Sequence, residues 1–459
     1  MEPRSAKFVA EACGGRLVSA HARPIARVCT DSREAGPGDL FVALAGERFD
    51  GHNFLGDVVA RGATAVMVEE KKVPGQLGGC AAIAVANTRQ AFGKLGARYR
   101  ADFDLPVVAV GGSNGKTTTK FLIASVLSQK LRTLASEASF NNDIGVPATL
   151  LKMEKSHQAA VLEVGTNHPG ELAPLLQMIQ PRFGVITNIG REHLEFFGSL
   201  EGVAAEEGRI AEVLPHDGIL FVHGDDAWSE KIALRSKGTT VRVGLSTKND
   251  WRASDLRFDG DGLRFNVSGS RPALTGDYRI NLVGQHQVVN ALFAIAVADT
   301  LALSRSEIQA GLSACPAPKM RLQIRRCGAI TILDDAYNAN ADSMVAALQT
   351  LVAMPWAGRR VAVLGDMAEL GEHANEAHQE VGRRAAELGV DQLFVVGPRA
   401  AIMGQSAGDA GLKNIKHFDE VGRAAIGVKE FVRGGDLILV KASRSMRLER
   451  IVDALQTSH

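Results

Sequence analysis

The segment GGSNGKTT at residues 111–118 limits what this chain can fold into more than any other stretch. It follows the apolar run 106–110 and precedes the apolar-periodic run 117–129, so it joins a predicted strand to a predicted helix. Glycines let backbone N–H groups curl around phosphate oxygens, and the helix N-terminus adds positive potential. We therefore expect a nucleoside triphosphate site in a mononucleotide-binding α/β domain.

Individual residues of this loop suit the same ligand. Lys116 can place a point charge on the β- and γ-phosphates, and the Thr117 hydroxyl can bind Mg²⁺. The strict GxxxxGK[ST] pattern is missed by one residue, because Val110 holds the first glycine position. The alternative is a glycine turn that happens to precede Lys-Thr, and the strand–loop–helix context favours the nucleotide.

Short apolar runs alternate with helical segments on both sides of the loop. Predicted strands at 106–110, 159–164 and 183–187 indicate a parallel, doubly wound sheet. Residues 250–282 alternate like antiparallel edge strands, and a long helix follows from about residue 285. Its apolar stretch 288–303 is too short to span a bilayer and is interrupted by polar residues, so we expect a buried helix.

The chain of 459 residues is long enough for about three domains. We predict an N-terminal α/β domain at 1–103, a central domain at 104–315 that binds the nucleoside triphosphate, and a C-terminal Rossmann-like α/β domain at 316–459. The last domain is marked by predicted strands, each followed by helix-like sequence. These strands are 329–335, 360–366, 391–397 and 436–443.

Acidic and imidazole side chains follow the predicted strands of the central domain. Glu163 ends one strand, His193 follows the next by a short loop, and Glu206 and Glu207 are predicted to open a helix. Ligands of open α/β sheets lie beyond the carboxyl ends of the strands, so these groups converge beside the phosphate loop and can hold Mg²⁺. Alone, such a Glu is more often a cap and such a His more often structural.

Other clusters are weaker. Glu372, His373 and His378 do not form HExxH, so a solvated helix face is favoured over zinc. Asp334-Asp335 suits a ribose or metal contact and a turn cap equally well. The triplet 31–33, Asp-Ser-Arg, is a turn on statistics alone.

Composition excludes several classes of protein. Fifty-two Lys+Arg against 51 Asp+Glu leave a net charge of +1, and aromatics are 5%, so neither nucleic acid nor an anionic membrane is an expected partner. The five cysteines have no zinc spacing and suggest reduced thiols. The first residues lack a signal-peptide core. We expect a cytoplasmic protein without stable membrane association.

Motifs along the whole chain closely resemble those of the Mur ligases of bacterial cell-wall synthesis. Two of them, 140–151 and 163–171, are typical of the branch that adds D-alanyl-D-alanine to UDP-N-acetylmuramoyl-tripeptide. The motifs are DSREAGPGDLFVALAGERFDGHNF (31–54), GGSNGKTT (111–118), FNNDIGVPATLL (140–151), EVGTNHPGE (163–171), NIGREHLEFFGS (188–199), GQHQVVNA (284–291), DDAYNANADSM (334–344), LGDMAELGE (364–372) and VKASRSM (440–446).

The resemblance implies a role for each matching position. ATP would be bound by Gly112, Ser113, Asn114, Gly115, Lys116, Thr117, Thr118, His286, Asn290, Arg321 and Asp335. Mg²⁺, in two sites, would be held by Thr117, Glu163 and His193, with Lys116, Glu163 and His193 as the catalytic set. The UDP-substrate would meet Ser32, Asn141 and Asn142.

The chain departs from the family pattern at one informative position. Many members have a lysine that becomes carbamylated where this chain has Glu207, in EEGRI (206–210). Glu supplies the carboxylate on a shorter arm, so our hypothesis is that Glu207 serves the second Mg²⁺ without carbon dioxide. Gln287 and Ala336 replace a common Asn and Ser, and both are mild changes.

The chemistry implied by the resemblance is amide formation through an acyl phosphate, in a monomer whose last domain closes on ATP and binds the dipeptide. The tripeptide carboxylate would attack the γ-phosphate, and the dipeptide amine would then displace phosphate. The third residue of the tripeptide is left open between diaminopimelate and lysine. Ser443 and Arg444 are candidates for the dipeptide carboxylate. The two alternative functions are those of a related ligase, such as folylpolyglutamate synthase, and of a nucleotide-gated switch, which needs only the phosphate loop.

Overall fold

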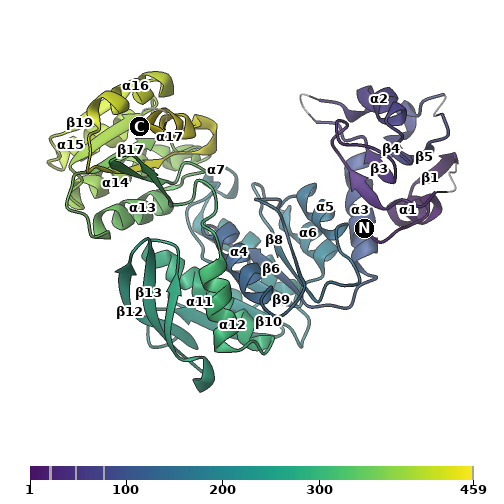
Figure 1. Ribbon diagram of the computed structural model, residues 1–459, viewed down its shortest axis with the longest axis horizontal. Coiled ribbons are helices and arrows are strands. Elements are labelled where there is room, and N and C mark those ends of the chain that lie inside the picture. The colour runs from purple at the N-terminus through teal and green to yellow at the C-terminus, as the bar shows by residue number, and fades with distance from the viewer. Residues whose placement is uncertain (20–22, 47–48, 76–77, 457–459) are drawn as a thin grey trace.

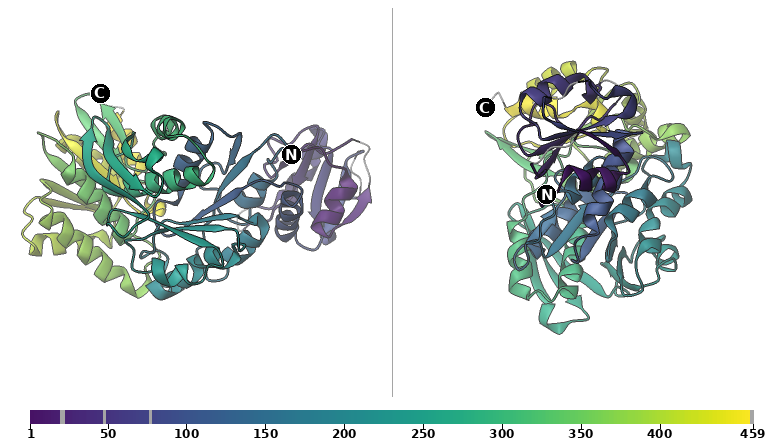
Figure 2. Two further views of the ribbon diagram at one scale, coloured as in Figure 1. Left: turned by 90° about the horizontal axis from the view of Figure 1, so that it is seen from below. Right: turned by 90° about the vertical axis from the view of Figure 1, so that its right-hand side faces the viewer.

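The computed structural model describes residues 1–19, 23–46, 49–75 and 78–456, and places three α/β domains in a row. The N-terminal and C-terminal domains lie at opposite ends of an elongated molecule, with the central domain between them (Figures 1 and 2). Within the described residues each domain contains one mixed sheet in which parallel pairs prevail. The predicted fold class is therefore confirmed.

The N-terminal sheet is parallel except for its edge strand β1, which pairs antiparallel with β5. Its last helix, α3 (Thr88–Arg100), begins at Asn87, whose side chain accepts from the backbone N–H of Gln90. The other helices are α1 (Ala6–Cys13) and α2 (Leu55–Ala60). The strands in spatial order are β1 (Arg16–Ser19), β5 (Ala81–Val85), β4 (Ala65–Glu69), β3 (Asp39–Val42) and β2 (Arg27–Cys29).

The central sheet is parallel from β7 to β12 and ends in the antiparallel strands β13 and β14. This confirms the prediction for residues 250–282, whereas β7, β10 and β11 were missed by the sequence analysis. The strands in spatial order are β14 (Gly276–Ile280), β13 (Gly262–Gly269), β12 (Trp251–Asp259), β11 (Thr239–Gly244), β10 (Ile219–His223), β9 (Phe183–Ile186), β6 (Val107–Gly111), β8 (Ala159–Glu163) and β7 (Thr133–Ala135).

Helices cover both faces of the central sheet, because both faces of its strands are apolar. Val107 and Ala109 of β6 belong to one core, and Val108 and Val110 belong to the other. The first core continues into the N-terminal domain through α3. Helices α5 (Gly145–Leu150), α6 (Leu172–Ile179) and α9 (Arg209–Val213) contribute to the first core, and α4 (Lys116–Leu127), α11 (Gln285–Thr300) and α12 (Arg305–Ala314) to the second.

Helix α11 is the buried helix predicted from its apolar sequence. All residues from Gln287 to Ala298 are buried, so none of its faces is in contact with solvent over that stretch. Nowhere in the described part of the chain is a helix both long enough and apolar enough to cross a membrane.

The C-terminal sheet is parallel except for edge strand β15 and is covered on both faces. Helices α13 (Ala341–Ala353), α14 (Ala374–Glu387) and α15 (Ala400–Asp409) pack on one face, and α16 (Val421–Phe431) and α17 (Glu449–Gln456) on the other. The strands in spatial order are β15 (Gln323–Cys327), β16 (Ile330–Asp334), β20 (Leu437–Lys441), β17 (Arg360–Gly365), β18 (Gln392–Val396) and β19 (Ile415–Phe418).

The face of α14 that carries His378 is buried, whereas the sequence suggested a solvated face. Glu372 is exposed as expected, but His378 is fully buried, where it accepts from the backbone N–H of Met367 and bonds to the carbonyl of Ala374. Burial lowers the pKa of His378, so its imidazole is a neutral structural link between the loop after β17 and α14.

Candidate active site

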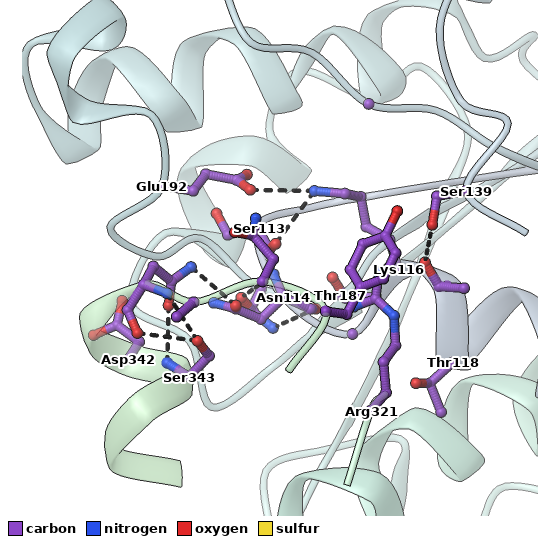
Figure 3. Close-up of a pocket in the computed structure, with 18 of the residues that line it drawn as sticks. Ser113, Asn114, Lys116, Thr118, Ser139, Thr187, Glu192, Arg321, Asp342 and Ser343 are labelled. Atoms are coloured by element: carbon purple, nitrogen blue, oxygen red, sulfur yellow. Dashed lines mark hydrogen bonds and ion pairs between the residues drawn. The ribbon is translucent and has the colours of Figure 1, made fainter. Parts of the chain in front are cut away.

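A cleft of about 760 Å³ lies between the central and C-terminal domains and contains most of the predicted site residues. The phosphate loop forms one wall, and the segment that follows β16 together with the start of α13 forms the opposite wall. Figure 3 shows Ser113 and Asn114 facing Asp342 and Ser343 of α13, while Lys116 points towards Glu192. The cleft is therefore assembled from two domains.

The phosphate loop needs glycine at two of its positions. Gly112 (φ +105°) and Gly115 (φ +84°) have backbone conformations that L side chains rarely adopt. A Cβ on Gly112 would lie 2.7 Å from the backbone nitrogen of Thr187, and one on Gly115 would lie 2.8 Å from Oδ1 of Asn290. Both faces of the loop are thus fixed by neighbours before any ligand binds.

Lys116 is the first residue of α4, and its ammonium group folds back onto the phosphate loop. Nζ donates to the carbonyls of Gly112 (2.5 Å) and Ser113 (3.2 Å) and lies 3.2 Å from the Glu192 carboxylate. Burial lowers the pKa of Lys116, whereas three nearby carboxylates together raise it by a larger amount. The net shift of the pKa is therefore upward. These carboxylates are Glu192, Glu207 and Glu163.

Glu163 ends β8 with its carboxylate at the floor of the cleft. Its side chain is 1% exposed; Oε1 accepts from the Asn141 amide at 3.0 Å, while Oε2 has no hydrogen-bond partner. A buried carboxylate oxygen left unpaired is costly in an apolar interior. Glu163 lines the cleft beside the phosphate loop, and a carboxylate oxygen without a hydrogen bond at that place suits a divalent cation.

Lys120 is the nearest cation to Glu163 and lies one helical turn after Lys116. Its side chain is fully buried, with Nζ 3.8 Å from Oε2 of Glu163. Nζ also donates to the carbonyls of Ser136 (2.7 Å) and Ala138. Burial lowers the pKa of Lys120 to about 8, although the Glu163 charge opposes that shift. Lys120 therefore ties the 136–138 turn to the Glu163 carboxylate.

The predicted metal ligands fit Mg²⁺ only if a nucleotide completes the site. Thr117, Glu163 and His193 all line the cleft. In the part of the chain that the structure describes, no three His, Cys, Asp or Glu side chains are grouped closely enough to hold a metal. Mg²⁺ commonly binds through one or two carboxylates and takes its other oxygens from phosphates and water. Oε2 of Glu163, which has no hydrogen bond, matches that arrangement.

Glu207 lies behind the phosphate loop and not on the cleft wall. Its Oε2 accepts from the backbone N–H of Gly112 at 2.6 Å, and its Oε1 has no hydrogen-bond partner. Burial raises the pKa of Glu207 to about 7. The prediction that Glu206 and Glu207 open a helix is wrong: they end α8 (Leu200–Glu207), which begins after Ser199, whose hydroxyl accepts from the N–H of Gly202.

The loop that follows β9 carries three consecutive residues with different partners. Arg191 pairs with Asp342 and Glu380 of the C-terminal domain. Glu192 pairs with Lys116, as described above. His193, with φ +49°, places Nδ1 2.6 Å from Oε2 of Glu369, also in the C-terminal domain. The same short loop therefore contacts the phosphate loop and the closing domain.

The predicted adenine-side residues form a linked set at the start of α11. The Asn290 amide donates to Oε1 of Gln287 (2.8 Å), and the Gln287 amide lies 3.1 Å from Nε2 of His286. Burial lowers the pKa of His286 to about 4, so its imidazole is neutral at physiological pH. A neutral ring with one donor and one acceptor suits a nucleobase.

The predicted C-terminal residues reach the same cleft. Asp335 lies 2.7 Å from Nζ of Lys441 and accepts from the backbone N–H of Leu322 at 3.0 Å. The Arg321 guanidinium stacks 4.2 Å above the centre of the Tyr337 ring. Asp334, the residue before Asp335, is instead fully buried and forms an ion pair with Arg325. Only the second residue of the Asp334-Asp335 pair is thus available to a ligand.

The predicted substrate residues do not all come together. Asn141 and Asn142 line the cleft, and Asn142 accepts through Oδ1 from the N–H groups of Ile144 and Gly145 at the start of α5. Ser443 and Arg444 also line it. Ser32 does not: it lies half-buried in a turn of the N-terminal domain.

Four residues of the site were missed by the sequence analysis: Lys120, Arg191, Glu192 and Glu369. Lys120 carried a signal, since a lysine four positions after Lys116 lies on the same helix face. Arg191 and Glu369 pair with residues 151 to 189 positions away in sequence, and no local pattern reveals such partners.

Comparisons with known proteins cover the whole chain. Three family models match: "Mur ligase family, catalytic domain" at residues 24–100, "Mur ligase middle domain" at 110–298, and "Mur ligase, glutamate ligase domain" at 320–444. A similar curated protein is UDP-N-acetylmuramoyl-tripeptide--D-alanyl-D-alanine ligase of Escherichia coli (strain K12), which is 37% identical over 94% of this chain and 93% of its own.

Solved structures agree. A crystal structure of MurF from Acinetobacter baumannii is 33% identical, covers all of both chains and superposes with a TM-score of 0.90. A MurF ligase from Thermotoga maritima in complex with ADP is 27% identical over 94% of this chain and 97% of its own, with a TM-score of 0.83.

Proposed function

The chain belongs to the Mur ligase family, and from that premise we propose that it is the ATP-dependent ligase that joins D-alanyl-D-alanine to UDP-N-acetylmuramoyl-tripeptide. The products are ADP, phosphate and the UDP-linked pentapeptide precursor of peptidoglycan. The observation that carries the proposal is the cleft in which a phosphate loop, a buried carboxylate with one oxygen free of hydrogen bonds and residues of the C-terminal domain meet. Curated relatives bear this activity in their names over nearly the full chain length.

A free carboxylate is a poor electrophile, so the reaction begins by activating it. The tripeptide carboxylate attacks the γ-phosphate of ATP, the bond to the β-phosphate oxygen breaks, and an acyl phosphate and ADP result. The amine of the dipeptide then attacks the acyl carbon, loses a proton and displaces phosphate. The first step brings an anionic carboxylate against an anionic triphosphate, and phosphate leaves as an anion in the second step, so positive charge at the phosphates is the main catalytic requirement.

The residues of the cleft can meet that requirement. Mg²⁺, when bound, would neutralise phosphate charge, and Thr117, Glu163 and His193 would hold it together with phosphate oxygens. The backbone of residues 112–118 would cradle the phosphates, and Lys116 would leave its carbonyl partners to contact the γ-phosphate. His286 and Asn290 would contact the base, and Arg321 and Asp335 the phosphates and ribose. Domain closure would exclude water from the acyl phosphate.

The three domains would divide the substrates between them. We assign residues 1–103 to the UDP part, with Ser32 near the nucleotide, 104–315 to ATP, and 316–459 to closure and the dipeptide. Asn141 and Asn142 would face the tripeptide, and Ser443 and Arg444 the dipeptide carboxylate. We also propose a cytoplasmic monomer without stable membrane association, and the near-zero net charge gives no electrostatic basis for binding nucleic acid or an anionic membrane.

Glu207 bears on the second Mg²⁺. We propose that its unpaired Oε1 takes the place of a carbamylated lysine, directly or through water. The variant Glu207→Lys and the wild type, assayed in carbon dioxide-free buffer with and without bicarbonate, test this. The wild type is expected to be indifferent to bicarbonate. A wild type that needs bicarbonate would contradict the assignment.

The ligase activity is tested by measuring phosphate release from ATP and Mg²⁺ with UDP-N-acetylmuramoyl-tripeptide, with and without D-alanyl-D-alanine. Release that depends on both substrates, accompanied by UDP-pentapeptide, is the expected result. Release that ignores the dipeptide would point to another ligase or to a nucleotide switch. Separate assays with lysine and diaminopimelate tripeptides would identify the third residue.

A further inference from the structure

Two strained residues from different domains face one another at the rim of the cleft. His193 (φ +49°) precedes α7 (Leu194–Phe197), and Glu369 (φ +60°) lies in the loop after β17. Neither residue is glycine, so the left-handed backbone conformation costs free energy at both positions. Surrounding contacts must therefore hold it in place. The backbone carbonyl of Glu369 accepts from the N–H of Glu195 at 3.2 Å, which fixes the two loops together. This second contact sets the position of the Glu369 side chain.

The side chains meet through one nitrogen of the imidazole. Nδ1 of His193 lies 2.6 Å from Oε2 of Glu369, and the His193 side chain is 15% exposed. With Nδ1 bonded to a carboxylate, Nε2 is the nitrogen left for a ligand. A histidine that binds a metal generally donates its other N–H to a carboxylate or a carbonyl, which fixes the tautomer and the ring orientation.

We propose that Glu369 is a positioning residue for the metal site: through Nδ1 it holds the His193 ring so that Nε2 faces the Mg²⁺ of the bound nucleotide. The inference rests on the proposed function, in which His193 helps to hold that ion. In this role Glu369 is not a ligand of the metal and acts only through His193.

The position of Glu369 gives this pair a consequence that a partner within the same domain would not have. His193 belongs to the central domain and Glu369 to the C-terminal domain, 176 positions further along the chain. The carboxylate reaches the ring only when the two domains are closed. Metal binding and closure then favour each other by the same factor, as any two linked equilibria must.

Glu369 is not needed to hold the domains together. Arg191, two positions before His193, already pairs with Asp342 and Glu380 of the C-terminal domain. The Glu369 side chain is 45% exposed, and a pair with one exposed partner contributes little to stability. Removing this carboxylate is therefore expected to change metal binding and leave folding almost unchanged.

The experiment measures Mn²⁺ binding by electron paramagnetic resonance in the presence of ADP, for the full-length wild type and three variants. Glu369→Ala is expected to weaken Mn²⁺ binding 10- to 100-fold. Glu369→Gln, which keeps a hydrogen-bond acceptor, is expected to lose less. Glu372→Ala is the matched control, because its side chain lies in the same loop and is 90% exposed, and it is expected to stay within twofold of the wild type.

A second comparison separates positioning from a general effect. In a His193→Ala background, Glu369→Ala is expected to cause no further loss of Mn²⁺ affinity, because it has no ring left to orient. Equal losses in both backgrounds, or a Glu369→Ala variant that binds Mn²⁺ like the wild type, would overturn the proposal. Melting temperatures of all variants exclude misfolding as the cause of a loss.

Failure of the proposed function would look different. It would appear as a wild type that binds Mn²⁺ and ADP but forms no UDP-pentapeptide, whatever Glu369→Ala does to Mn²⁺. A wild type that forms the product, together with a Glu369→Ala variant of unchanged Mn²⁺ affinity, would leave the ligase activity standing and remove only this inference.

Discussion

At the scale of single residues, the phosphate loop rests on a carboxylate whose charge depends on pH. Glu207 is 1% exposed and contacts the loop through the N–H of Gly112. Burial raises its pKa from 4.5 to about 7. Between those two values the folded protein keeps the proton that the unfolded chain has lost. The Glu207 contribution to stability is therefore fully present below pH 4.5 and is lost as the pH rises through 7.

The variant Glu207→Gln removes this titration and keeps an acceptor for Gly112. We expect the melting temperature of the variant, relative to the wild type, to rise between pH 5 and pH 8. Glu201→Gln, at an exposed position of the same helix, is the control and should give a difference that does not change with pH. A Glu207→Gln difference that is equally constant would mean that Glu207 does not titrate in this range.

Lys120 is the second residue whose burial makes a prediction. Lys120→Met keeps the length of the side chain but leaves the Glu163 carboxylate and two carbonyls without their cation. Removing one partner of a buried pair typically destabilises a protein by about 3–5 kcal/mol. We expect a loss of that order in urea denaturation of Lys120→Met.

The control for this loss is Lys152→Met, because Lys152 is 52% exposed and pairs with Glu137 of the same turn. An exposed pair contributes about 0–1 kcal/mol, so this variant should be close to the wild type. The double variant Lys120→Met/Glu163→Gln should lose less than the sum of its single variants, because the unpaired charge is gone. Additive losses would show that the two side chains do not interact.

At the scale of elements, helix α13 begins at a residue with two functions. The Asn340 side chain accepts from the N–H of Ser343 at 2.8 Å, which caps the helix, and its amide donates to Oδ1 of Asn114 in the phosphate loop at 3.0 Å. One side chain thus connects the start of a C-terminal helix to the nucleotide site of the central domain.

Two substitutions separate these functions. Asn340→Ser keeps a capping oxygen and loses the contact with Asn114, whereas Asn340→Ala loses both. We expect Asn340→Ala to lower the free energy of unfolding by about 1 kcal/mol, and Asn340→Ser to lower it by much less. ADP affinity, measured by calorimetry, should fall similarly in both. If Asn340→Ser is as unstable as Asn340→Ala, the cap is not what Asn340 contributes.

Elements with a strong local signal were predictable from the sequence. Strand β6, the phosphate loop and α4 follow from an apolar run, glycines and a periodic helix, and the antiparallel strands after residue 250 follow from their alternation. Strand β7, of three residues, is too short for a pattern. The start of α8 was misplaced although Ser199 is a capping residue, because the two glutamates at its end were taken as its first turn.

The residues of the candidate site also fall into two groups, those predictable from local sequence and those that depend on contacts between distant parts of the chain. Residues 112–118 and Glu163 could be predicted because their positions after strands are local properties. The pairing of His193 with Glu369 could not, since it depends on how two domains meet. Glu207 was predicted as a metal-site carboxylate, but its contact with the N–H of Gly112 depends on a helix that ends behind the loop.

At the scale of the whole molecule, Arg191 forms two ion pairs between the central and C-terminal domains. Its guanidinium is shared by Asp342 and Glu380, and its side chain is 28% exposed. Contacts of this kind between domains are weak enough to open and close, and salt weakens them further. Arg191 is therefore expected to shift the balance between open and closed forms.

Arg191→Ala should increase the radius of gyration measured by small-angle X-ray scattering without ligands. It should also raise KM for the dipeptide several-fold, because the proposed dipeptide site includes Ser443 and Arg444 of the C-terminal domain. Raising the salt concentration should open the wild type in the same direction. Arg209→Ala, which removes a pair within the central domain, is the control and should change neither quantity. A compact Arg191→Ala protein at low salt would contradict this role.

The Arg191 contact also has an evolutionary consequence. Its two acidic partners lie 151 and 189 positions further along the chain, and each faces the same guanidinium. A lineage that replaces the arginine loses the reason to keep either acid, so substitutions at the three positions should be correlated among relatives. Glu192, which lies between Arg191 and His193, contacts Lys116 of the central domain and is therefore under a different constraint. Neighbouring residues of one short loop should therefore diverge at unequal rates.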